Sequence, residues 1–124
     1  MTKVLVVDDS NLARRSTRKI LETAGHEVVE AEDGLRALER YYLDKPDVVV
    51  LDVTMKDMDG IEVLKRLRDL DKAAKVVMVT ADVQTSTRDM AAASGACGFV
   101  VKPVHAKSLL ETIQNVLTEE SPCN

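Results

Sequence analysis

Aromatic side chains are scarce in this sequence of 124 residues, which has two tyrosines, one phenylalanine and no tryptophan. Any hydrophobic core must therefore be aliphatic, and the 45% of apolar residues is enough to build one. An excess of basic residues is also lacking, since 17 lysines and arginines stand against 21 aspartates and glutamates. The resulting net charge of −4 argues against direct binding to a nucleic-acid backbone.

Cysteines and long hydrophobic runs are few as well. Cys97 and Cys123 match no metal-ligand spacing and make no disulfide framework, so we expect free thiols in a reducing compartment. The apolar run Val4–Val7 is too short for a signal-peptide core, and no run approaches the length of a membrane span. We expect a soluble, cytoplasmic protein with one domain over residues 1–120 and a short tail over 121–124.

Five short apolar runs alternate with segments of helical spacing. The runs are rich in β-branched residues and are mostly continuous, which is typical of strands buried on both faces of a parallel sheet. They are Val4–Val7, Val28–Val29, Val48–Leu51, Val76–Val79 and Phe99–Val101. Five β–α units in succession predict an α/β fold, a doubly wound (βα)5 parallel sheet with right-handed crossovers.

The helical segments differ in how strongly their sequences favour packing. Gly25 is placed to end the first helix, and Leu35, Leu38 and Tyr42 form the apolar stripe expected for the second. The fourth segment, from Gln84 to about Ser94, offers little apolar surface and should be the weakest helix.

Basic residues gather on the first helical segment. Arg14, Arg15, Arg18 and Lys19 lie on the side of this segment that we expect to be exposed. We interpret them as a solvated face rather than a docking patch.

Polar residues follow all five runs, but the second run ends in Ala31–Glu32 ahead of a helix start, and we assign it no role. The first run ends in Asp8 and Asp9, the third in Asp52, the fourth in Thr80 and the fifth in Lys102. Because the carboxyl ends of parallel strands share one edge of the sheet, we expect these side chains to meet there. A lone aspartate at a strand end is usually a turn former, but four complementary groups together favour a functional site.

This set of residues suits phosphoryl chemistry. Aspartates without histidine or cysteine nearby favour a hard cation, and Mg²⁺ fits best because it takes one or two carboxylates together with phosphate oxygens. Mg²⁺, the Thr80 hydroxyl and the Lys102 ammonium could each contact one phosphoryl oxygen. Asp52 would then be the nucleophile that becomes an aspartyl phosphate.

The chain resembles the receiver domain of bacterial two-component response regulators, above all its stand-alone, CheY-like members. The resemblance runs from about Thr2 to Glu119 and implies a flavodoxin-like, CheY-like sheet with the strand order 2-1-3-4-5. The matching motifs are VLVVDD at Val4–Asp9, VVVLDVTM at Val48–Met55, DG at Asp59–Gly60, VTA at Val79–Ala81 and KP at Lys102–Pro103.

The resemblance also implies roles for these residues. Asp52 accepts a phosphoryl group from a histidine kinase, while Asp8, Asp9, the Asp52 carboxylate and the backbone carbonyl of Thr54 hold Mg²⁺. Thr80 and Lys102 contact the phosphoryl oxygens, and the Lys102–Pro103 peptide is expected to be cis. The protein would promote its own phosphotransfer and dephosphorylation without being an enzyme that acts on another substrate.

A switch in surface structure is implied as well. Thr80 and Phe99 stand where the family has its switch residues, and Thr54 and Asp82 stand where it tunes dephosphorylation. The surface of the fourth helix, fifth strand and fifth helix would then change on phosphorylation. We expect a monomer whose target is another protein, with no direct nucleic-acid or membrane partner.

Three other functions compete with a kinase-driven chemotaxis switch that binds a flagellar motor component. A phosphorelay intermediate, which passes its phosphoryl group to a histidine phosphotransfer domain, stays open. A haloacid-dehalogenase-like phosphatase is disfavoured because it needs a second aspartate where Thr54 stands. A flavin carrier is disfavoured because the residues after the first run, Asp8–Asn11, are wrongly charged for a phosphate loop.

Overall fold

Helices and strands alternate along the whole described chain, as the sequence predicts. The computed structural model describes residues 2–55, 59–81 and 85–118. Its elements are β1 (Lys3–Val7), α1 (Asn11–Thr23), β2 (Glu27–Ala31), α2 (Gly34–Asp44), β3 (Val48–Asp52), α3 (Gly60–Leu70), β4 (Val76–Thr80), α4 (Thr85–Ala93), β5 (Gly98–Val101) and α5 (Ala106–Thr118). Among these described helices, none is both long and apolar enough to cross a membrane.

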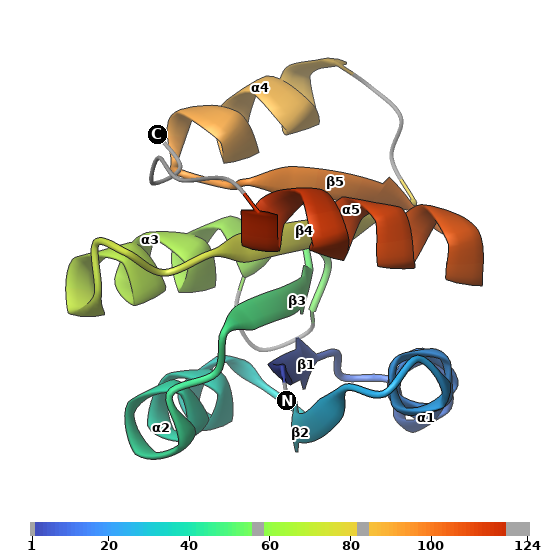
Figure 1. Cartoon of the computed structure of the whole chain (residues 1–124). Helices are drawn as coiled ribbons and strands as arrows, with labels where there is room; N and C mark the ends of the chain where they lie inside the picture. Colours follow the sequence, from blue (N-terminus) through green and yellow to red (C-terminus); the bar gives the residue numbers. More distant parts are fainter. Residues whose placement is uncertain (1, 56–58, 82–84, 119–124) are drawn as a thin grey trace.

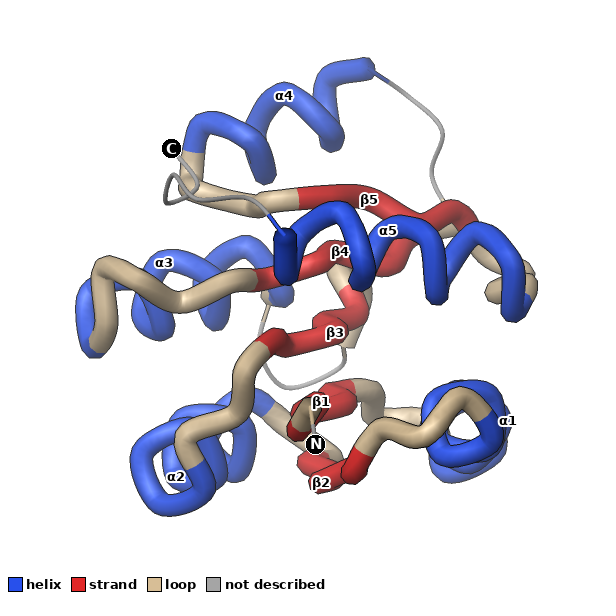
Figure 2. The backbone as a smooth tube through the Cα atoms, in the orientation of Figure 1, coloured by secondary structure: helices blue, strands red, loops and turns tan. Residues whose placement is uncertain are grey.

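The five strands form one parallel sheet in the order β2-β1-β3-β4-β5 (Figure 1). This order confirms the predicted doubly wound α/β fold. Helices cover both faces of the sheet (Figure 2). Since β1 pairs with β3, the chain reverses its direction of winding between these two strands, and the reversal opens a crevice at their carboxyl ends.

Each central strand supplies alternate residues to two separate cores. Val4, Val6, Val48 and Val50 pack with residues of α1 and α5, including Leu21 and Leu109. Leu5, Val7, Val49 and Leu51 pack on the other face with residues of α2, α3 and α4, including Ala37, Leu64 and Ala91. Two-sided burial explains the continuous apolar runs, because both faces of a central strand are covered by helices.

Helix starts lie close to the carboxyl ends of the strands. Ser10, Asp33 and Asp59 cap α1, α2 and α3 by accepting hydrogen bonds from backbone N–H groups of the first turn. Gly25 follows the end of α1 with a φ of +93°, which confirms the predicted stop because other residues rarely adopt that angle.

The apolar stripe predicted for α2 is wrong, because the buried positions lie one residue earlier along the helix. Leu35 and Tyr42 are exposed by 69% and 68%, whereas Ala37 and Tyr41 are buried and Leu38 is partly buried. The small Ala37 lets the helix approach the sheet. Tyr41 is buried because its hydroxyl donates a hydrogen bond to Asp71 Oδ2 at 2.8 Å, which satisfies the polar end of the ring.

Two further predictions need correction. Arg14 does not belong to a solvated face, because its side chain is only 13% exposed and pairs with Glu30 of β2. Cys97 is disulfide-bonded rather than a free thiol, and the only other cysteine, Cys123, lies outside the described residues. The spacing of two cysteines in a sequence does not reveal that the fold brings one of them to a partner.

The weakest predicted helix is present as α4. It spans Thr85–Ala93, and Gln84 at its predicted start lies outside the described residues. Ala91 is buried against the core, but Met90 is 58% exposed. The apolar surface that α4 adds near its end is therefore small.

Candidate functional site

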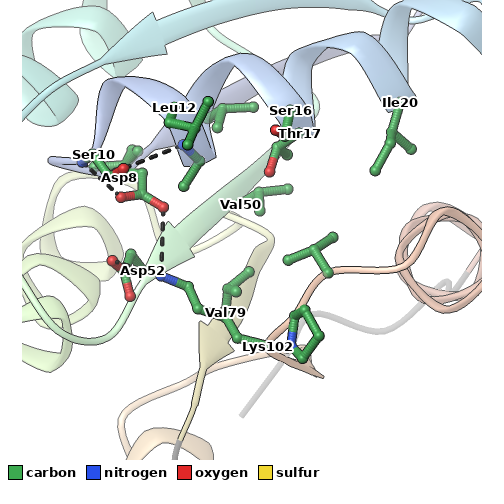
Figure 3. A pocket seen from close by; sticks show the side chains of 15 residues that line it. Asp8, Ser10, Leu12, Ser16, Thr17, Ile20, Val50, Asp52, Val79 and Lys102 are labelled. Carbon is green, nitrogen blue, oxygen red and sulfur yellow. Dashed lines mark hydrogen bonds and ion pairs between the residues drawn. The ribbon is translucent and has the colours of Figure 1, made fainter.

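Three carboxylates meet at the carboxyl ends of β1 and β3. Asp8 and Asp9 follow β1, Asp52 is the last residue of β3, and one carboxylate oxygen from each lies within 4.8 Å of the others. Asp8 and Asp52 are buried, whereas Asp9 is exposed. The side chains of Asp8, Asp52 and Lys102 converge in the close view (Figure 3).

Asp52 has a different hydrogen-bond donor for each oxygen. The backbone N–H of Thr54 donates to Oδ1 at 3.1 Å, and the Lys102 ammonium donates to Oδ2 at 3.2 Å. The same ammonium lies 3.6 Å from Oδ2 of Asp8. One lysine from the loop after β5 therefore forms ion pairs with two buried carboxylates, at the ends of β1 and β3.

One ammonium faces two buried carboxylates at this edge. Burial raises the pKa of the Asp52 carboxyl above its ordinary value, and the neighbouring Asp8 charge raises it further. The Thr54 N–H and Lys102 lower the pKa but do not reverse the shift. Ionisation of Asp52 therefore costs more free energy here than in water, and a bound cation would offset that cost.

An all-oxygen donor set of this kind fits Mg²⁺. The three carboxylates offer hard ligands, and the exposed Asp9 gives access from solvent. No histidine or cysteine belongs to this group, which distinguishes it from zinc sites.

The turn after β1 is shaped by Asp8 itself. Its Oδ1 accepts a hydrogen bond from the Ser10 N–H at 2.9 Å, and its own N–H donates to the Ala31 carbonyl of β2 at 3.2 Å. Ser10 then caps α1 through Oγ, which accepts from Ala13 N–H at 3.2 Å. The sequence Asp-Asp-Ser thereby joins a strand to a helix and turns two carboxylates to the sheet edge.

The other predicted residues have definite places in the fold. Thr80 is buried at the end of β4, and its carbonyl accepts from the Lys102 N–H at 2.8 Å. Thr54 is exposed in the loop after β3, and half-buried Phe99 packs against the α2–α4 core. The Lys102–Pro103 peptide is cis. Asp82 lies outside the described residues.

A cavity of about 360 Å³ adjoins the carboxylates. Leu12, Thr17 and Ile20 of α1 line it (Figure 3). Pro103 and Val104 belong to its lining as well. Asp8, Asp52 and Lys102 belong to the same lining, so the cavity opens beside the acidic cluster.

Gly60 is a site residue whose role was not predicted. A Cβ atom at this position would lie 2.4 Å from the Asp52 carbonyl oxygen and 2.6 Å from Val53 Cα. In the sequence the DG motif indicates only a family signature and a helix start, yet the glycine is needed because α3 begins directly against the backbone of Asp52. A glycine eight residues after a strand-end aspartate was the available signal.

The comparisons with known proteins agree with this arrangement. The family model of the response regulator receiver domain matches residues 4–114. The chain belongs to the response regulator receiver domain family. It is a CheY-like member. It is 41% identical over 116 residues to the chemotaxis protein CheY of Bacillus subtilis, a match that covers 93% of this chain and 97% of that protein.

Solved receiver structures share the fold. The chemotaxis protein CheY4 of Vibrio cholerae superposes with a TM-score of 0.91 at 38% identity, covering 94% of this chain and 99% of that one. CheY of Borrelia burgdorferi, solved as a complex of CheX, CheY, BeF3 and Mg²⁺, gives a TM-score of 0.90 at 31% identity, with 95% and 90% coverage.

Proposed function

We propose that this receiver domain is a phosphorylation-dependent switch whose phosphoacceptor is Asp52. The observation that carries the proposal is the placement of the buried Asp52 carboxylate, 3.2 Å from the Lys102 ammonium and clustered with Asp8 and Asp9. Few other roles require three carboxylates and a shared lysine at one sheet edge.

Phosphotransfer follows from the roles of these side chains. An oxygen of Asp52 attacks the phosphorus of a kinase phosphohistidine, the new P–O bond replaces the P–N bond, and the imidazole nitrogen takes the electron pair. The Lys102 ammonium neutralises charge on the phosphoryl oxygens, and the Thr80 hydroxyl donates a hydrogen bond to one of them. Asp8, Asp9, Asp52 and the Thr54 carbonyl would hold Mg²⁺, which when bound neutralises further charge on the phosphoryl group.

The output surface would respond through β4 and β5. The two strands are paired, with Met78 beside Phe99 and Thr80 beside Val101. Thr80 moves toward the phosphoryl group, Phe99 turns into the space that it leaves, and the surface of α4, β5 and α5 changes. A protein partner that prefers one surface shifts the population by its difference in affinity.

We propose that this protein acts in the cytoplasm and that its partners are a histidine kinase and a downstream protein. A flagellar motor component is the favoured target because the relatives named above are chemotaxis proteins. The second candidate is a histidine phosphotransfer protein. Capture of binding proteins with and without beryllofluoride would separate these two candidates. A motor component should bind only the activated form of this protein. A phosphotransfer protein is recognised instead because it accepts the phosphoryl group. Thr54 and Asp82 would set the rate at which the phosphoryl group is lost.

The direct test uses a small phosphodonor such as acetyl phosphate with Mg²⁺. Wild-type protein should gain the mass of one phosphoryl group, and Asp52→Asn should gain none. Asp59→Asn is the matched control, because it removes a carboxylate nearby while an asparagine can still cap α3. A phosphoryl group found at residue 52 of the Asn variant, or no gain by wild type, would overturn the assignment.

A further inference from the structure

Arg14 of α1 forms an unusual set of contacts next to the acidic cluster. Its Nη1 donates to the backbone carbonyl of Asp8 at 2.7 Å, and its Nε donates to Glu30 Oε1 at 2.9 Å. Its Nη2 also donates to Asn11 Oδ1 at 2.5 Å. One guanidinium thus joins the end of β1, the start of α1 and the neighbouring strand β2.

The carbonyl that Arg14 binds belongs to the peptide between Asp8 and Asp9. This peptide links the two carboxylates that follow β1, so its orientation determines how both side chains leave the turn. The Ser10 N–H holds the Asp8 carboxylate on one side, and the Ala31 carbonyl holds the Asp8 N–H on the other. Arg14 supplies the remaining constraint, on the carbonyl.

Glu30 keeps the guanidinium in this orientation. Burial alone would raise the pKa of the Glu30 carboxyl, but hydrogen bonds from Arg18 and Arg14 lower it below its ordinary value. Its side chain is 25% exposed, and its two oxygens accept from different arginines. Glu30 is therefore ionised at neutral pH and fixes Arg14 through a charge-assisted hydrogen bond.

We propose that Arg14, oriented by Glu30, is a positioning residue that preforms the divalent-cation site by fixing the Asp8–Asp9 peptide. This inference rests on the proposed function, because it assigns the cation to the cluster of Asp8, Asp9 and Asp52. A lysine at position 14 keeps the charge but lacks the planar fork, so it cannot reach the carbonyl, Asn11 and Glu30 together.

The test measures binding of Mn²⁺ to the unphosphorylated protein, by electron paramagnetic resonance of the free ion. Arg14→Lys should weaken Mn²⁺ binding about tenfold, as expected for a residue that orients metal ligands. Glu30→Gln should weaken it in the same direction by less, because the amide oxygen still accepts. The matched control is Arg18→Lys. Arg18 shares Glu30 with Arg14, but its other partner is Glu22 and not the turn after β1.

A second readout separates positioning from loss of fold. At saturating Mg²⁺, Arg14→Lys should accept phosphate from acetyl phosphate at the wild-type rate, with only the half-saturating Mg²⁺ concentration raised. Unchanged Mn²⁺ affinity in Arg14→Lys, or an equal loss in Arg18→Lys, overturns the inference. Failure of wild type to bind Mn²⁺ or to gain phosphate would instead overturn the proposed function.

Discussion

The carboxylates at the two ends of the sheet differ in their hydrogen-bond and ion-pair partners. At the amino ends of the strands, Asp47 Oδ2 accepts from the Lys3 N–H at 2.8 Å, and Asp71 accepts from the Tyr41 hydroxyl and the Ala73 N–H. At the carboxyl ends, buried Asp8 and Asp52 share one lysine. The carboxylates at the amino ends are each satisfied by neutral donors, whereas at the carboxyl ends one ammonium is shared by two buried carboxylates, an arrangement that a bound cation would stabilise.

The largest effect should come from adding a side chain where the start of α3 lies against Asp52. In Gly60→Ala the new methyl group would overlap the Asp52 backbone, so the start of α3 or the end of β3 must move. We expect a loss of about 3 kcal/mol in the free energy of unfolding by urea. Phosphorylation by acetyl phosphate should also slow, because the Asp52 carboxylate moves with its backbone.

Gly25→Ala is the control at the opposite end. Among the described residues, no atom lies within 4 Å of the position that the added methyl group would take, so the cost comes only from the positive φ and should be about 1 kcal/mol. Its phosphorylation rate should equal that of wild type. Equal slowing in both variants would mean that lost stability, rather than contact with Asp52, causes the effect.

A loss of stability of intermediate size is expected from a substitution at the amino ends of the strands. Tyr41→Phe removes the hydrogen bond to Asp71 and should lower the free energy of unfolding by about 1 kcal/mol, without changing phosphorylation. Tyr42→Phe, at an exposed position of the same helix, should change neither quantity.

The pH dependence of Tyr41 has a definite sign. Burial, followed by the hydrogen bond to Asp71, raises the pKa of the Tyr41 phenol above its ordinary value. The neutral phenol therefore stabilises the fold below about pH 10, and this contribution is lost as the pH rises beyond that value. Urea titrations from pH 8 to 11 should show wild type falling toward Tyr41→Phe, and parallel curves would contradict the assignment.

The smallest expected effect is a gain in thermal stability from a substitution at the carboxyl ends of the strands. The raised pKa of Asp52 means that its ionisation opposes folding, so Asp52→Asn should melt about 1–3 °C above wild type in the presence of a chelator at pH 7. This difference should disappear as the pH falls toward the ordinary carboxyl pKa of about 4.

Magnesium provides the complementary measurement. Saturating Mg²⁺ should raise the melting temperature of wild type more than that of Asp52→Asn, because the ion binds the folded state of the intact cluster. A variant that melts below wild type in chelator would show that Lys102 already balances the charge of Asp52.

Much of the fold was predictable from the sequence because each central strand is apolar along nearly its whole length. The run Val48–Leu51 predicts two-sided burial, and Asp52 directly after it predicts a polar residue at the sheet edge. The stripe on α2 was misjudged because helical spacing cannot tell whether Leu35 or Tyr41 faces the core when a tyrosine hydroxyl can find a partner such as Asp71.

The missed parts of the site depend on contacts between distant segments. Nothing next to Arg14 in sequence indicates that Glu30 of β2 will meet it, so the arginine looked like one of four solvated charges. Gly60 likewise shows its role only when α3 is placed against Asp52. Pattern predicts which residues reach the edge of the sheet, whereas the three-dimensional fold decides what supports them there.

The pairing of Lys102 with Asp52 has a consequence for biosynthesis. These two residues are 50 positions apart, and Lys102 reaches the site only after β5 has joined the sheet. At typical rates of translation a ribosome adds Lys102 about 3–10 s after Asp52. A nascent chain thus carries Asp52, the phosphoacceptor that we propose, well before the lysine that pairs with it. If the proposed phosphotransfer needs Lys102, a kinase would modify completed chains and leave unfinished ones unmodified.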